Sequence, residues 1–94
     1  MNVVTTDKFI EHLEKLKNDV STVERAEKAV AKLREANSLR EVPNIKSMEG
    51  APGFYRLRIG DYRIGFRLID ENTIRLLAID RRSVFYRRFP FHFQ

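Results

Sequence analysis

The chain has 94 residues and a net charge of +5, and it contains no cysteine. This length accommodates one modest hydrophobic core, so we expect a single domain over residues 1–94. The cysteine count excludes disulfides and thiolate metal sites, and no apolar run approaches a membrane span, so we expect a cytoplasmic protein without a membrane partner.

Residues 2–6 are mostly β-branched, which predicts a short first strand. Thr5 or Thr6 followed by Asp7 is a helix-start signal. Four apolar residues then recur at helical spacing, namely Phe9, Leu13, Leu16 and Val20. His12 lies beside this stripe, among charged residues, and we expect it at the surface of the first helix.

A second helix is predicted to begin at residues 21–24, whose Ser-Thr-Val-Glu sequence is a capping box. Asn37 and Ser38 end its apolar stripe. Two amphipathic helices with so short a connection are expected to pack as an antiparallel hairpin. Residues 39–53 contain several Pro and Gly turn signals and read as a connector.

Residues 54–67 predict a β-hairpin, because two alternating segments flank Gly60 and Asp61. Glycine at the first central position suits a type II′ turn, and this turn places Arg58 opposite Arg63. One face of the hairpin then collects the apolar side chains of Tyr55, Leu57, Ile59, Tyr62, Ile64 and Phe66. The opposite face collects Arg56, Arg58, Arg63 and Arg67.

The second half of the chain carries the whole positive excess. Residues 50–94 contain nine arginines, no lysine and four acidic residues, whereas residues 1–49 are neutral. Like charges on opposite strands destabilise a sheet, so the arginine face of the hairpin suggests an anionic partner. Arginine is favoured where phosphate or carboxylate is bound in bidentate geometry.

Residues 73–79 form a nearly continuous apolar run, which predicts a strand covered on both sides.

The aromatic residues after this strand, interleaved with arginines, suit stacking on single-stranded RNA. We expect Phe85 in the core, and Phe91 and Phe93 against a partner. Pro90 disfavours a helical Phe89, so a C-terminal helix cannot extend far.

These elements predict an α+β fold in the order β-α-α-β-β-β. The N-terminal strand and the two-helix hairpin are expected to pack on one face of an antiparallel β-sheet. The other face of the sheet is left to the arginines.

Residues 55–64, with the sequence Tyr-Arg-Leu-Arg-Ile-Gly-Asp-Tyr-Arg-Ile, and residues 81–86, with Arg-Arg-Ser-Val-Phe-Tyr, resemble the RelE/ParE superfamily of bacterial toxins. The resemblance extends over nearly the whole chain. It implies the toxin component of a type II toxin–antitoxin system. It also implies a cognate antitoxin, the ribosome and mRNA as partners, and neither a metal nor a small-molecule cofactor.

Ribosome-dependent endoribonucleases of this superfamily cut mRNA with clustered basic residues and often a tyrosine. Carried over to this chain, the catalytic positions are Arg56, Arg58, Arg63, Arg81 or Arg82, and Tyr86 on the last strand. Further RNA contacts are expected from Lys46, Arg67, Arg87 and Arg88. The arginines would neutralise the phosphate while Tyr86 handles a proton, since guanidinium groups favour the phenolate form of tyrosine. The alternative for Tyr86 is one more core aromatic.

The chain departs from the superfamily pattern at two acidic positions. Asp80 follows Ile79 where Gly-His is frequent, and Glu49 replaces a lysine. Two other functions therefore stay open. One is a ParE-like inhibitor that binds DNA gyrase without cutting nucleic acid, and the other is a degenerate, non-toxic member that binds RNA or an antitoxin.

Overall fold

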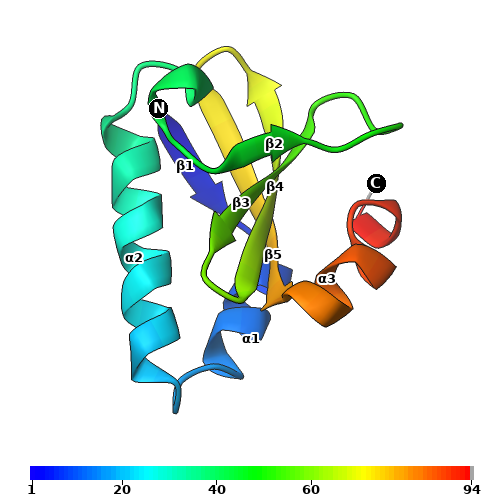
Figure 1. The fold of residues 1–94 in the computed structure, drawn as a ribbon. Helices are drawn as coiled ribbons and strands as arrows, with labels where there is room; N and C mark the ends of the chain where they lie inside the picture. Colours follow the sequence, from blue (N-terminus) through cyan, green and yellow to red (C-terminus); the bar gives the residue numbers. More distant parts are fainter. Residues whose placement is uncertain (94) are drawn as a thin grey trace.

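The computed structural model describes residues 1–93. Its elements in chain order are β1 (Asn2–Thr5), α1 (Asp7–Glu14), α2 (Val20–Glu35), the 3-10 turn η1 (Leu39–Glu41), β2 (Ile45–Ser47), β3 (Phe54–Ile59), β4 (Tyr62–Asp70), β5 (Thr73–Arg81), α3 (Arg82–Arg88) and η2 (Phe91–Phe93). The strands form one sheet in the order β1-β5-β4-β3-β2. Helices α2 and α3 lie on opposite sides of this sheet (Figure 1).

The α+β fold, with the helix pair on one face of the sheet, is confirmed. The sheet is mixed, because β1 runs parallel to β5 while the other neighbouring pairs are antiparallel. The short strand β2, within the expected connector, pairs with β3. Alternation along a strand predicts which side chains share a face, but long-range packing decides which strands become neighbours.

Side-chain caps decide where the first two helices begin. The Thr6 hydroxyl accepts a hydrogen bond from the Phe9 N–H (3.2 Å) and donates one to the Leu76 carbonyl (2.9 Å), which ties α1 to β5. Helix α2 begins earlier than its capping-box sequence predicts. Asp19 is the cap, because its carboxylate accepts from both the N–H (3.2 Å) and the hydroxyl (2.8 Å) of Thr22.

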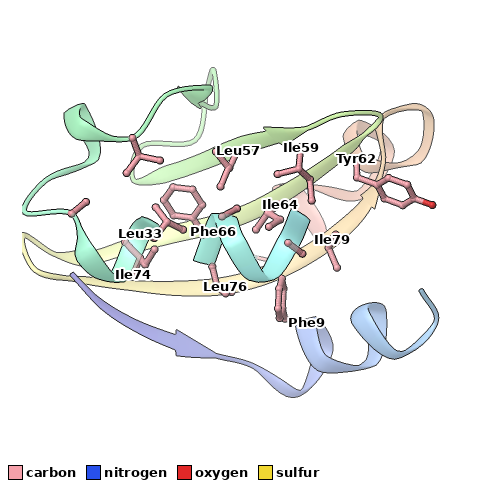
Figure 2. Packing of buried hydrophobic residues seen from close by; sticks show 14 residues of the cluster. Phe9, Leu33, Leu57, Ile59, Tyr62, Ile64, Phe66, Ile74, Leu76 and Ile79 are labelled. Atoms are coloured by element: carbon pink, nitrogen blue, oxygen red, sulfur yellow. The ribbon is translucent and has the colours of Figure 1, made fainter. Parts of the chain in front are cut away.

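The main core lies between the sheet and the helices α1 and α2. Its most deeply buried large side chains, each 2% exposed or less, are Phe9, Leu33, Ile64, Phe66, Ile74, Leu76 and Ile79. Figure 2 shows Tyr62 at one end of this core, with its hydroxyl group pointing away from the other side chains. A groove of about 180 Å³ lies between α1 and α2, so each helix packs on the sheet rather than closely on the other helix.

A second core covers the opposite face of the sheet. This corrects the expectation from the sequence that only arginines would occupy this face. The second core contains Ala51, Phe54, Leu77, Ala78, Phe85 and Phe89. The Phe89 ring stacks on Phe85 at 4.9 Å and lies over Gly65, where a Cβ atom would be 2.6 Å from two of its ring carbons. Strand β5 is therefore buried on both sides, as its apolar run predicts.

Helix α3 packs on the sheet through the second core, to which it contributes Phe85. It ends at Arg88, and Phe89 is extended (φ −91°, ψ 136°), which confirms that Pro90 limits the C-terminal helix. No helix within residues 1–93 has the length and apolar character needed to cross a bilayer.

Candidate functional site

The β3–β4 hairpin has the predicted register, with Arg58 opposite Arg63 across the two-residue turn. Gly60 has a φ of +63°, while Asp61 has no positive φ, which is the pattern of a type II′ turn. The apolar side chains of the hairpin join the main core. Its arginines therefore lie on the α3 side of the sheet.

Phe89 divides the arginine face. Its ring covers Gly65, which lies between Arg63 and Arg67 on β4. The Arg67 guanidinium lies 5.3 Å from the centre of the Phe54 ring, at the end of the sheet away from the turn. The four arginines thus do not form one continuous patch, because an aromatic core occupies the middle of the face.

Arg63 is nearly buried, with 7% of its surface exposed. Its Nη1 donates to the carbonyls of Gly60 (2.8 Å) and Tyr62 (2.9 Å), which anchors the guanidinium at the turn. Within residues 1–93, neither its buried Nε nor the buried Oδ2 of Asp80, the residue opposite on β5, has a hydrogen-bond partner. Arg63 therefore supports the hairpin as well as adding positive charge beside it.

The other basic residues of β2 and β3 lie along the outer edge of the sheet. Lys46 pairs with Arg56, whose Nη1 donates to the Asn44 carbonyl (2.9 Å). Arg58 is exposed and lines a groove of about 320 Å³. Three basic residues of α2 line the same groove, namely Arg25, Lys28 and Lys32. Positive charge thus continues around the edge of β3 from the sheet to α2.

Helix α3 and the residue before it bring three of the catalytic candidates together. Arg81, Arg82 and Tyr86 line one pocket of about 410 Å³ with Asp61 and Ser83. Arg82 and Tyr86 lie four residues apart on the helix, and such residues share a face. Tyr86 is 46% exposed and is not a core residue.

The assignment of Tyr86 to a last strand is wrong, because residues 82–88 are helical. Two contacts hold this helix at the hairpin turn. The Arg82 N–H donates to the Asp61 carbonyl (2.8 Å), and the Arg81 guanidinium lies 5.5 Å from the centre of the Tyr62 ring. The pocket therefore has two walls that are joined directly, the turn and the start of α3.

The remaining RNA-contact candidates lie elsewhere. Arg87 and Arg88 are exposed on α3, but Arg88 lines a different pocket of about 220 Å³ with His12 and Asp80. Lys46 and Arg67 are exposed on the sheet and line no part of the Tyr86 pocket. The structure thus groups Arg81, Arg82 and Tyr86, pairs Arg58 with Arg63, and separates the others.

His12 is buried, which contradicts its expected place at the surface. Its Nδ1 accepts a hydrogen bond from the Ile79 N–H (3.3 Å) beyond the end of β1, and lies 3.7 Å from Oδ2 of Asp80. Burial lowers the pKa of His12, although the Asp80 carboxylate opposes this shift. The spacing in the sequence could have predicted this burial, because His12 follows Phe9 by three residues and precedes Leu16 by four, which places it on the apolar face of the helix.

The chemistry available at the Tyr86 pocket is limited to a few groups. The two guanidinium groups stay protonated and can bind phosphate in bidentate geometry. The phenol of Tyr86 can donate or accept a proton, and Asp61 offers a carboxylate. Such a set suits a negatively charged ligand that carries both a phosphate and polar groups.

Comparisons with known proteins find toxins of type II toxin–antitoxin systems, all from the RelE/ParE superfamily. The family model described as the ParE toxin of the type II toxin–antitoxin system, parDE, matches residues 3–85. Toxin RelE3 of Methanocaldococcus jannaschii is 28% identical over 91 residues, which cover 96% of this chain and 100% of that protein.

Solved structures show the same architecture. The RelB–RelE antitoxin–toxin complex from Methanococcus jannaschii contains a chain with a TM-score of 0.73 and 25% identity, and the match covers 93% of this chain and 99% of that one. The YoeB dimer from Staphylococcus aureus has a TM-score of 0.70 over 87% of this chain and 97% of its own. At 15% identity, that second likeness concerns the fold alone.

Proposed function

The chain belongs to the family of ParE toxins of type II toxin–antitoxin systems, and we propose that it acts like the RelE-type members of the RelE/ParE superfamily and cleaves messenger RNA on translating ribosomes. The pocket shared by Tyr86, Arg81 and Arg82 carries the proposal, because it joins a proton-transfer group to phosphate-binding groups. The likeness to Toxin RelE3, which extends over the whole of that protein, supports it. A ribosomal target places the toxin in the cytoplasm.

In the proposed reaction, the 2′-hydroxyl of a nucleotide attacks the adjacent phosphate in line with the leaving oxygen. Arg82 and Arg81 neutralise the charge that develops on the phosphate, which is often the largest contribution to such catalysis. The P–O5′ bond breaks, which leaves a 2′,3′-cyclic phosphate and a 5′-hydroxyl. Tyr86 either takes the proton of the 2′-hydroxyl or gives one to the leaving oxygen, and water carries out the other proton transfer. Of the two arginines, Arg82 is the better candidate for direct contact, because Arg81 is already placed over Tyr62.

The basic residues of the sheet have a supporting role in this proposal. Arg58 is exposed beside the turn and is positioned to hold the RNA backbone, while the nearly buried Arg63 adds positive potential from beneath. Asp80 lines the pocket of His12 rather than the pocket of Tyr86. The acidic departure from the superfamily pattern is therefore compatible with nuclease activity.

We propose a cognate antitoxin as the partner that holds the toxin inactive. The RelB–RelE structure from Methanococcus jannaschii is an antitoxin–toxin complex, and its toxin-like chain matches 93% of this one. Acidic segments of an antitoxin would neutralise the exposed arginines of β3 and α3. Complex formation should accordingly weaken as the salt concentration rises.

Induced expression without the antitoxin, followed by mapping of transcript 5′ ends, tests the proposed activity. We expect new 5′ ends in phase with codons inside translated regions. Intact messages together with an induced DNA-damage response would instead indicate a gyrase inhibitor. Normal growth with intact messages would indicate a non-toxic member of the family.

Tyr86→Phe tests the proposed role of the phenol. We expect single-turnover cleavage on programmed ribosomes to fall by about 10²- to 10⁴-fold, the usual contribution of general acid–base catalysis. Tyr55→Phe is the matched control, because it removes a phenol that stacks on Phe66 in the main core (5.6 Å between ring centres). An unchanged rate in Tyr86→Phe would exclude the proton-transfer role.

A further inference from the structure

Asp61 occupies an unusual place in the Tyr86 pocket. Among the described residues it is the only acidic residue that lines this pocket, together with two arginines, a serine and a tyrosine. Its carbonyl accepts the Arg82 N–H at 2.8 Å, so the turn that carries Asp61 is fastened to the helix that carries Tyr86. Asp61, the two arginines and Tyr86 therefore line one pocket, whose walls are the turn and the start of α3.

The Asp61 carboxylate remains available for a ligand. Within residues 1–93 it forms no ion pair with Arg81 or Arg82, although both line the same pocket. Its side chain also takes no part in the hydrogen bonds that fasten the turn, in which the Asp61 carbonyl accepts from the Arg82 N–H and the Gly60 carbonyl accepts from Nη1 of Arg63. An ionised carboxylate accepts hydrogen bonds and donates none, so its partner must present N–H or O–H groups.

The other side chains that line the pocket are suited to binding a nucleotide. Tyr86 is 46% exposed, and its contact with Phe85 is edge-to-face (5.1 Å between ring centres), which leaves ring surface for stacking. Arg82 and Arg81 can bind a phosphate, and Ser83 supplies a small polar wall. Single-stranded RNA is recognised by stacking of this kind together with hydrogen bonds to the edges of the bases.

We propose that Asp61 is a specificity-determining residue, which reads the base of one unstacked RNA nucleotide held in this pocket. The inference rests on the proposed function and adds a base preference to it. Guanine presents two adjacent donors, N1–H and the N2 amino group, that match the two oxygens of a carboxylate. Uracil presents a single N3–H between two carbonyl oxygens, which the carboxylate repels. The pocket should therefore prefer guanine to uracil.

The alternative is that Asp61 has only a conformational role, because aspartate favours this type of turn. Asp and Asn serve equally well in such turns, so Asp61→Asn keeps the backbone preference while replacing an acceptor by a group that also donates. Glu49→Gln is the matched control, because it makes the same change of charge at an exposed loop residue outside the pocket. Comparing the two variants separates base reading from turn geometry and from net charge.

Titration of the full chain with GMP, AMP, CMP and UMP, followed by amide resonances of the pocket residues, tests the inference without cleavage. We expect GMP to bind about 5- to 150-fold more tightly than UMP, the range typical of one bidentate contact to a base. Asp61→Asn should remove most of this ratio, and Glu49→Gln should retain it. Equal affinities for the four nucleotides, or an unchanged ratio in Asp61→Asn, would overturn the proposal.

Single-turnover cleavage on ribosomes programmed with codons that differ in one base extends the test to the natural substrate. We expect wild type to favour guanine at one codon position, and Asp61→Asn to lose that preference. If the chain binds GMP selectively but cuts no message, the nuclease proposal fails while the base-reading pocket stands. If it cuts messages and Asp61→Asn keeps the same preference, the nuclease stands and the role of Asp61 is refuted.

Discussion

The docking of α3 on the sheet depends on the absence of a side chain at Gly65. A methyl group there would lie 2.6 Å from two ring carbons of Phe89 and 2.8 Å from a third, whereas carbon atoms in contact prefer about 3.5–4.0 Å. The ring has little room to retreat. It is 1% exposed, it stacks on Phe85, and its centre lies 5.8 Å from that of Phe54.

We therefore expect Gly65→Ala to destabilise the protein. Overpacking of a close-packed core costs about 1–3 kcal/mol, and the better strand propensity of alanine returns about 0.5–1 kcal/mol. The net loss is then at most about 2.5 kcal/mol, and at about 4–8 °C per kcal/mol for a domain of this size it would lower the Tm by up to roughly 20 °C. Urea unfolding followed by far-UV circular dichroism measures the change in the free energy of unfolding.

A double-mutant cycle makes the test specific to the ring. In a Phe89→Ala background the added methyl group has space, so Gly65→Ala should be neutral or slightly stabilising there. The coupling free energy between the two sites should then be about 1–3 kcal/mol. An equal cost of Gly65→Ala in both backgrounds would refute the reasoning, because the clash with Phe89 would not be its source.

Two further predictions concern α1. Burial lowers the pKa of His12, so the free energy of unfolding should be highest above about pH 6.5 and should decline as the pH falls below that value. In thermal melts between pH 7.5 and 5, His12→Gln should make this decline smaller. Parallel curves for the two proteins would contradict the assignment. Thr6→Ala removes both hydroxyl bonds and should cost about 1–2 kcal/mol in urea unfolding, whereas Thr6→Ser should recover most of it. Equal losses in both variants would exclude the cap.

The sequence alone predicted the features that depend on neighbouring residues. The hairpin register follows from Gly60 and Asp61, since a two-residue turn leaves one pairing of the strands. The buried run of β5 and the early end of α3 before Pro90 likewise follow from local composition. The candidate arginines and Tyr86 were also chosen from the sequence, and their catalytic role stays a prediction; their arrangement could not be predicted.

Only the tertiary structure decided what covers each surface. Alternation placed the arginines opposite the main core, but it could not show that Phe89, 24 residues after Gly65, would close over the middle of that face. For the same reason, the sequence could not show that His12 is buried under the edge of β5 or that β1 pairs in parallel with β5. Nor could the sequence show that Asp61 and Tyr86 line one pocket, because the turn and α3 come together only after the chain has returned through β4 and β5. Local spacing determines which side chains share a face, whereas contacts between distant segments determine whether that face is core, site or open surface.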